Sequence, residues 1–339
     1  MRPVTSPFRG VATLSLVTAT LTYLLVVLGN LVRSTNSGLS YLTWPLYHGR
    51  LVPDREFHIL MEFSHRAVAG ALSLLLVALA VAVFRRAETR TRLGALTVVA
   101  LLLVVAQIVL GALTVWKLLS PAVVTGHLAT AVALFAAVLW IHLVASRETR
   151  GPGAGPAADA APPAGPARAG RSAARADAAR EEQALSARAT LALAALAVYG
   201  QMILGALVST QHAGLAVPDF PTANGRWFPP LEGLVGVQMI HRYGAYVLTA
   251  VLAIAAWRAG QSEDSRVRAG ARWAVVLVLV QVALGALNVL WRLPVWLSAL
   301  HLANAEALLA VCVVTAFRAS PERPARSRRA AGPAPAVTR

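Results

Sequence analysis

"SHRAVAG" at residues 64–70 and "IHRYGAY" at residues 240–246 place the same His-Arg pair 176 positions apart in the chain. The same separation relates "GNLVRSTNSGLSYLTWP" at 29–45 to "GALVSTQHAGLAVPDFP" at 205–221. A separation of 174 relates "QIVLGALTV" at 107–115 to "QVALGALNV" at 281–289, and "HLATAVAL" from 127 to "HLANAEAL" from 301. Matched stretches in the same order predict a chain built from two similar units in tandem.

The composition indicates a membrane protein, since 57% of the 339 residues are hydrophobic, 14% are charged and the mean hydropathy is +0.61. A bilayer core of about 30 Å needs about 20 apolar residues per helix. Eight stretches meet this length, at about 11–32, 60–84, 93–116, 121–145, 188–209, 236–257, 272–292 and 296–317. We therefore predict an all-α membrane protein with eight transmembrane helices in two tandem four-helix bundles. An even number of spans in each unit makes this a parallel repeat.

This prediction divides the chain into four parts. An N-terminal four-helix unit covers 11–146, a disordered cytoplasmic linker 147–187, a C-terminal four-helix unit 188–317 and a cytoplasmic tail 318–339. The linker is inferred from "GPGAGPAADAAPPAGPARAGRSAARADAAR" at 151–180, which is rich in Ala, Pro, Gly and Arg and has no apolar period.

The net charge of +16 has a distribution that indicates membrane topology. If the N-terminus is cytoplasmic, the inner segments hold 23 of the 31 Lys and Arg residues. This positive-inside bias places both termini in the cytoplasm. Nucleic-acid binding is not expected, because no aromatic residues are interleaved with the arginines. Arg is used almost to the exclusion of Lys, which indicates a bacterial source and hence a multi-pass protein of the plasma membrane.

Four of the eight histidines recur at equivalent positions, His65 with His241 and His127 with His301. In the predicted topology all four lie near the outer face at similar depth, on the second and fourth spans of each unit. Two imidazoles on neighbouring helices at one depth suit bis-histidine ligation of a heme iron, which brings its own four equatorial nitrogens. Structural zinc wants four protein ligands and is a poorer match. We expect the remaining histidines, His48, His58, His142 and His212, to be solvated or interfacial.

A carboxylate distinguishes the two units. Glu62 precedes His65 by three residues, so the two share a helix face, while the repeat counterpart of Glu62 is Gln238. An ionisable residue inside a span is functional by default, and the glutamine can bind but cannot exchange a proton. The alternative is an ion pair between Glu62 and Arg66. Arg66 and Arg242 suit heme propionates, and equally lipid headgroups.

Together these residues resemble the heme A synthase family, membrane enzymes that convert heme O to heme A for terminal oxidases. The resemblance covers about 11–317 and rests on "GNLVRSTNSGL" followed by "WP", then "EFSHR", "TGHLATA", "AGLAVPDFP", "IHRYGAY" and "LHLANA". Each motif by itself is a weak indicator of the family, but their order across eight spans is specific to it.

The resemblance implies that His241 and His301 ligate a resident heme b that carries electrons. It implies that His65 and His127 hold the heme O substrate, with Glu62 as the catalytic carboxylate. The reaction oxidises the C8 methyl to an alcohol and then to a geminal diol that loses water to give a formyl group. A heme O synthase and terminal oxidase assembly factors are then the expected partners, together with an electron acceptor that the sequence does not identify.

The chain departs from the family pattern in its loops. Many members carry a cysteine pair in the first outer loop, whereas the only cysteine here, Cys312, lies in the last span. The Pro-Asp pair occurs only in the second loop, as Pro218 and Asp219. An electron-transfer protein, a di-heme b-type cytochrome without catalysis, would explain the four histidines equally well but leaves the Glu62 and Gln238 difference unexplained. A heme transporter is disfavoured, because no inverted repeat is visible.

Overall fold

The computed structural model describes the backbone of residues 6–44, 55–150 and 168–320, with side chains in these ranges except at 168–181. Within them the chain forms eight α-helices and a short 3-10 helix, η1. Their bounds are α1 (Phe8–Ser34), α2 (Phe57–Phe84), α3 (Ala87–Trp116), α4 (Pro121–Arg150), α5 (Arg168–Thr210), η1 (Ala213–Leu215), α6 (Gly233–Gly260), α7 (Ser265–Leu290) and α8 (Val295–Arg318). All eight α-helices contain a segment long and apolar enough to cross a membrane. The predicted all-α class with eight spans is confirmed.

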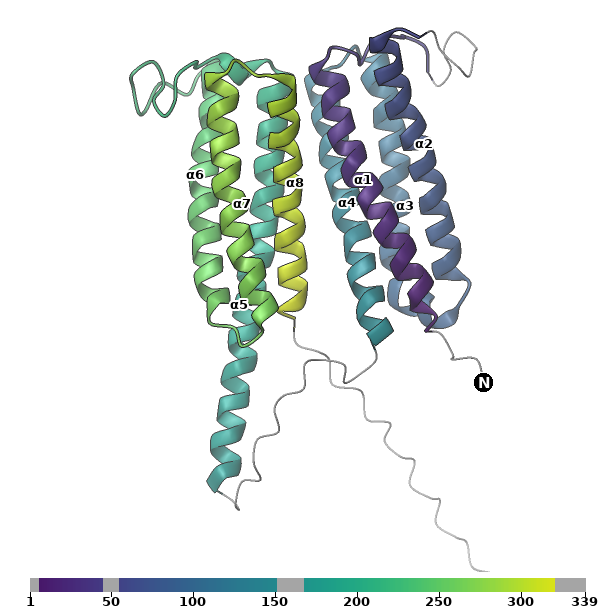
Figure 1. Ribbon diagram of the computed structural model, residues 1–339, viewed down its shortest axis with the longest axis vertical. Coiled ribbons are helices and arrows are strands. Elements are labelled where there is room, and N and C mark those ends of the chain that lie inside the picture. The colour runs from purple at the N-terminus through teal and green to yellow at the C-terminus, as the bar shows by residue number, and fades with distance from the viewer. Residues whose placement is uncertain (1–5, 45–54, 151–167, 321–339) are drawn as a thin grey trace, which may run out of the picture.

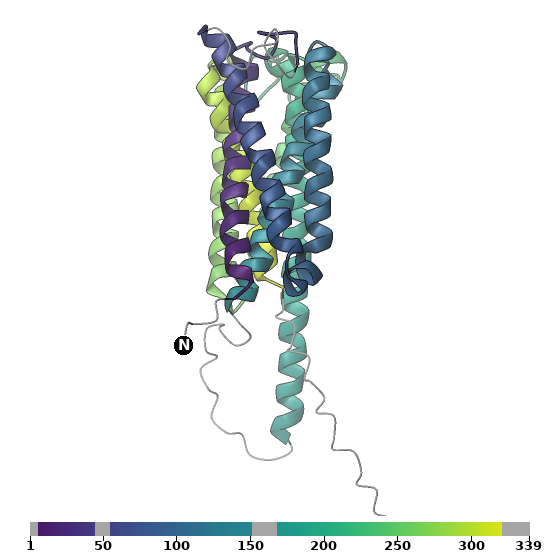
Figure 2. The ribbon, with the colours of Figure 1, turned by 90° about the vertical axis from the view of Figure 1, so that its right-hand side faces the viewer.

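The helices pack as two four-membered rings that lie side by side (Figure 1). In the first ring α1 and α3 each pack on both α2 and α4, so α2 lies across the ring from α4. The helices α5 to α8 repeat this order, which places α6 across from α8. The rings meet where α1 packs on α8 and where α4 packs on α5 and α8. Figure 2 shows that the helices of both rings run along one common axis.

Each ring has its own apolar core, and large apolar side chains also cover the outside. Leu79 and Ile141 are fully buried in the first ring, and Leu191 is fully buried in the second. On the outside, Leu74 is 73% exposed and Leu196 is 68% exposed. Exposed apolar surface is unfavourable in water and not in hydrocarbon, so this exterior fits a lipid environment.

The turns that lead into α4 and α8 share one backbone conformation. Leu118 and Leu119 have φ of 47° and 58°, and Arg292 and Leu293 both have φ of 58°. This left-handed region is uncommon for residues other than glycine. Leu119 N donates to Thr114 O (2.8 Å), and Leu293 N donates to Asn288 O (2.7 Å). Each bond satisfies a carbonyl at the C-terminal end of the preceding helix, α3 or α7. The two tight turns therefore reverse the direction of the chain at equivalent positions in the two rings.

The predicted disordered linker at 147–187 is wrong for part of its length. α4 continues to Arg150 and α5 already begins at Arg168, so α5 extends well beyond the ring (Figure 1). Residues 151–167 lie outside the described residues, as does most of the predicted tail. The stretch from 168 lacks an apolar period but is rich in Ala and Arg. These are strong helix formers, so propensity outweighs the missing period.

Candidate functional site

The four repeated histidines lie on facing helices of the two rings. His65 on α2 is across from His127 on α4, and His241 on α6 is across from His301 on α8. In each ring the two imidazoles are close enough to interact electrostatically. The structure therefore brings together the two pairs predicted from the sequence.

The other two helices of each ring contribute a glycine beside each imidazole. A Cβ added at Gly29 of α1 would lie 3.1 Å from Cε1 of His65, and one at Gly205 of α5 would lie 3.0 Å from Cε1 of His241. The corresponding distances are 3.5 Å from Gly111 of α3 to His127 and 3.1 Å from Gly285 of α7 to His301. In each ring, two facing helices thus direct histidines into the interior, and the other two place glycines, which have no side chain, beside them.

Several ring nitrogens are buried without a hydrogen-bond partner in the described part of the chain: Nδ1 of His65, His127 and His301. Buried polar groups normally have partners, so these side chains are available to a ligand. Two imidazoles in each ring, with glycines beside them, fit a flat macrocycle that requires axial ligands. No group of three or more His, Cys, Asp or Glu suited to a bare metal ion occurs among the described residues.

Glutamines that the sequence analysis did not single out support three of the histidines. Gln107 Nε2 donates to His127 O (2.8 Å) and Gln281 Nε2 lies 3.2 Å from His301 Nε2. Gln201 Nε2 contacts both Nδ1 (3.0 Å) and the carbonyl (2.7 Å) of His241. Gln107 and Gln281 begin the matched stretches "QIVLGALTV" and "QVALGALNV", so a repeated amide inside two apolar spans was the available signal.

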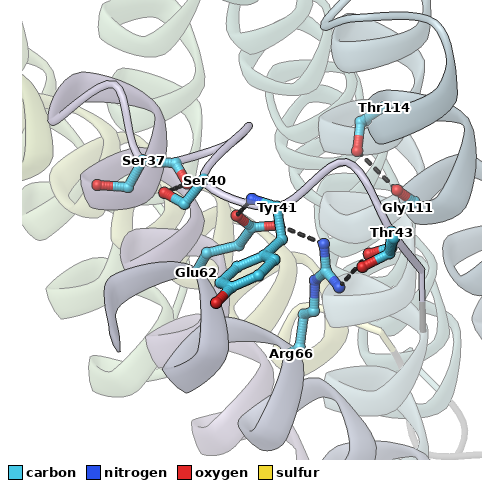
Figure 3. Close-up of polar contacts among 8 residues, drawn as sticks. All are labelled: Ser37, Ser40, Tyr41, Thr43, Glu62, Arg66, Gly111 and Thr114. Atoms are coloured by element: carbon cyan, nitrogen blue, oxygen red, sulfur yellow. Dashed lines mark hydrogen bonds and ion pairs between the residues drawn. The ribbon is translucent and has the colours of Figure 1, made fainter. Parts of the chain in front are cut away.

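Glu62 lies under the outer loop of the first ring, 4% exposed. Its carboxylate is paired with Arg66, and it accepts a hydrogen bond from the backbone N–H of Tyr41 at 3.2 Å (Figure 3). Arg66 Nη1 also donates to Thr43 O (3.0 Å). The ion pair that the sequence analysis kept as an alternative role for Glu62 is thus present.

Gln238 makes the equivalent contact in the second ring. It is 2% exposed, and its Oε1 accepts from Val217 N at 2.6 Å. Val217 follows Tyr41 by the same 176 residues that separate Gln238 from Glu62. The Nε2 of Gln238 also donates to Gly214 O (2.8 Å). Both side chains hold an outer loop, so charge is the main chemical difference between them.

Arg242 binds the second loop without an acidic partner on α6. Its Nη2 donates to Val217 O (2.8 Å) and its Nη1 to Thr222 O (3.2 Å). Like Arg66, it contacts loop carbonyls, which explains its place at the outer end of the helix better than contact with lipid headgroups would.

The second loop is further organised by Asp219. Its carboxylate accepts from Asn224 N (2.8 Å), Thr222 Oγ1 (2.7 Å) and Gly225 N (3.3 Å). The hydrogen bond from the Asn224 backbone, followed by that from Thr222, lowers the pKa of Asp219 to about 2. Asp219 is therefore ionised at neutral pH and acts as an acceptor only.

The other histidines contribute less to the site. His58 lies in the first turn of α2 and is exposed, with Nδ1 3.0 Å from Ser37 Oγ. His142 Nδ1 lies 2.9 Å from Ala12 O, a contact between α4 and α1. His212 is exposed, and His48 lies outside the described residues.

The fold and the site define a class of protein: a polytopic helical membrane protein with a pair of facing histidines inside each of two four-helix rings. Residues 54–313 match the COX15-CtaA family, described as cytochrome oxidase assembly protein, and the chain belongs to this family.

Similar proteins include the heme A synthase of Symbiobacterium thermophilum, 31% identical over 296 residues that cover 86% of this chain and 90% of the relative. The heme A synthase of Shouchella clausii is 29% identical over 287 residues, covering 83% and 87%. That of Halalkalibacterium halodurans is 27% identical over 280 residues, covering 80% and 85%.

Proposed function

We propose that this chain is a heme A synthase, an oxidoreductase that converts the C8 methyl of heme O to a formyl group. The observation that carries the proposal is the pair of facing histidines in each ring, combined with the carboxylate of Glu62 at a position where the second ring has the amide of Gln238. The family and the names of the relatives support it. In this proposal the N-terminal ring oxidises the heme that it binds, and the C-terminal ring binds a heme that is not altered.

The N-terminal ring is the substrate site in this proposal. His65 and His127 bind the iron of heme O from opposite sides and hold the macrocycle in one orientation, and the loop held by Glu62 and Arg66 covers the outer end. Each oxidation adds the oxygen of one water and releases two electrons and two protons. Two rounds turn the methyl into a geminal diol, which loses water to give the formyl group.

Glu62 is the proposed proton acceptor of this reaction. Its carboxylate is oriented by Arg66 and by the Tyr41 N–H. A positioned carboxylate can take the proton of an attacking water, or stabilise positive charge on the methyl carbon as electrons leave. Gln238 can do neither, although it holds its loop in the same way.

The C-terminal ring is the proposed site of a resident heme b, held by His241 and His301. When bound, this cofactor supplies one-electron transfer, so electrons from the substrate can leave through it. Gln201 and Gln281 orient the two imidazoles through the contacts described above. Arg66 and Arg242 are proposed propionate contacts, because a guanidinium pairs well with carboxylates.

We place the protein in the bacterial plasma membrane with both termini in the cytoplasm. The α2–α3 and α6–α7 turns lie at the same end of the molecule as the start of α1 (Figure 1), and Arg85, Arg86 and Arg258 lie near them. The positive-inside rule assigns this end to the cytoplasm. A heme O synthase, terminal oxidase assembly factors and an electron acceptor are the proposed partners.

Heme analysis tests the function directly. The chain is expressed beside a heme O synthase in a host that makes no heme A, and extracted hemes are separated chromatographically. We expect heme A, together with heme b that stays with the purified protein. Heme b without heme A would instead support the electron-transfer cytochrome, which the ion pair between Glu62 and Arg66 makes the second candidate.

A further inference from the structure

Two equivalent hydrogen bonds connect the two rings. Tyr23 of α1 donates from its hydroxyl to Ala303 O of α8 (3.1 Å), and Tyr199 of α5 donates to Ala129 O of α4 (3.1 Å). Tyr199 follows Tyr23 by 176 residues, and Ala303 follows Ala129 by 174. Each tyrosine therefore binds the carbonyl two residues beyond a candidate heme-ligating histidine of the other ring.

The equivalence ends at Glu306 on α8. The corresponding residue of α4 is Val132, which packs into the core of the second ring. Glu306 is fully buried, and neither of its carboxyl oxygens has a hydrogen-bond partner in the described part of the chain. An ionisable group placed in this way inside a membrane protein is expected to be functional.

The surroundings of Glu306 offer little to balance a negative charge. α8 packs on α1, α4, α5 and α7, and Tyr23 is the titratable side chain that interacts with Glu306 electrostatically. Tyr199 is the other titratable residue in the middle of these helices, since 128–141 of α4 and 273–290 of α7 contain no Asp, Glu, Lys, Arg, His or Tyr. A buried carboxylate without a counter-ion is costly, so a nearby positive charge must be present whenever Glu306 is ionised.

The proposed heme b can supply that charge in one of its two redox states. Glu306 follows His301 by five residues, which is about 7.5 Å along the helix axis and about 140° around it. The carboxylate is therefore within reach of the heme's electrostatic field but lies on the side of α8 that packs on α1. Leaving the propionates aside, the iron–porphyrin core has a charge of +1 when ferric and none when ferrous, because the porphyrin ring contributes two negative charges. An anion at Glu306 is therefore stabilised by the oxidised heme and not by the reduced one.

We propose that Glu306 is a proton-binding site coupled to the heme of the C-terminal ring, an inference that rests on the proposed function. When an electron reduces the iron from ferric to ferrous, the Glu306 carboxylate takes up one proton and becomes the neutral acid. When the electron leaves for the acceptor, the proton is released. The summed charge of the heme and the neighbouring carboxylate stays constant, which lowers the cost of moving electrons through a membrane protein.

Redox titration of the purified, heme-loaded protein at a series of pH values tests this coupling. We expect the midpoint potential of heme b to fall as pH rises, by up to about 59 mV for each tenfold decrease in proton concentration. Glu306→Gln removes this slope, whereas Glu306→Asp retains it. Tyr23→Phe moves the pH range of the slope, because it alters the residue next to Glu306, and the matched Tyr199→Phe leaves the range unchanged. A slope that persists in Glu306→Gln overturns the inference.

Infrared difference spectra provide a second readout that does not depend on a variant folding. Reduction of the unmodified protein should produce the C=O stretching band of a protonated carboxylic acid, shifted in D₂O and lost in Glu306→Gln. Absence of that band from the unmodified protein overturns the inference. If the absorbance spectrum shows no bis-histidine heme that depends on His301, the proposed function itself fails, and this inference fails with it.

Discussion

Replacing Glu62 by Gln separates the chemical role of this residue from its role in holding the loop. The second ring shows what a glutamine can do at this position, because Gln238 accepts a hydrogen bond from Val217 N at 2.6 Å. The amide oxygen introduced by Glu62→Gln can accept the bond from Tyr41 N in the same way. The substitution therefore removes the charge and the exchangeable proton while the outer loop stays attached.

The structure also limits the cost in stability. Removing one partner of a buried ion pair typically costs about 3–5 kcal/mol. Arg242 shows that a guanidinium at the equivalent position can be held by loop carbonyls alone, and Arg66 already donates to Thr43 O. We therefore expect Glu62→Gln to lower the free energy of unfolding by about 1.5–3 kcal/mol, the value of a hydrogen bond to a charged group.

The effect on activity should be much larger. Acid–base catalysis by a positioned side chain contributes about 10²- to 10⁴-fold to a rate, so heme A formation should fall by that factor while bound heme O and heme b remain. The assay is the ratio of heme A to heme O in membranes that contain equal amounts of protein, with Gln238→Glu as the matched control. Undiminished heme A formation by Glu62→Gln would refute the catalytic role. Loss of bound heme together with activity would show that Glu62 is needed mainly for the structure of the site.

The remaining predictions concern the ring interior and the second loop. Gly285→Ala should lower heme b content, because the added methyl meets the His301 imidazole at 3.1 Å. Overpacking of about 1–3 kcal/mol makes this roughly 5- to 150-fold in heme affinity. Gly111→Ala, beside His127 of the first ring, is the matched control and should leave heme b content unchanged, so equal losses would contradict the placement of heme b in the second ring. Asp219→Asn should speed tryptic cleavage after Arg226, which is exposed in this loop, because the amide nitrogen cannot accept the bonds from Thr222 and Gly225; an unchanged cleavage rate would show that these bonds do not order the loop. Since the pKa of Asp219 is lowered to about 2 from an ordinary value near 4, its stabilisation of the loop is complete above about pH 4 and is lost as pH falls towards 2. Digestion by an acid protease should show the loop opening in that window in the unmodified protein but not in Asp219→Asn.

Much of the architecture could be predicted from the sequence because the bilayer imposes strong local rules. A span must be about 20 apolar residues long, and this requirement determines the number of helices without knowledge of their packing. The four histidines were identified because they occur at matching positions in the two units, and Glu62 was identified because its counterpart is Gln238. The apolar period misled in one place, since the start of α5 was judged by its missing apolar period and not by its helix-forming residues.

What the sequence determined by itself is therefore the set of helices and the residues able to carry the chemistry. Only the tertiary structure showed that each of those histidines faces a glycine on an adjacent helix, and that Glu62 and Gln238 hold loops in the same way. It also placed Glu306 between the rings, although the carboxylate was visible in "HLANAEAL" opposite "HLATAVAL". These contacts join a helix to another helix or to a loop, and their partners lie well apart in the chain. The lateral order and rotation of packed helices decide which side chains meet, and those properties do not follow from the hydropathy of any single span.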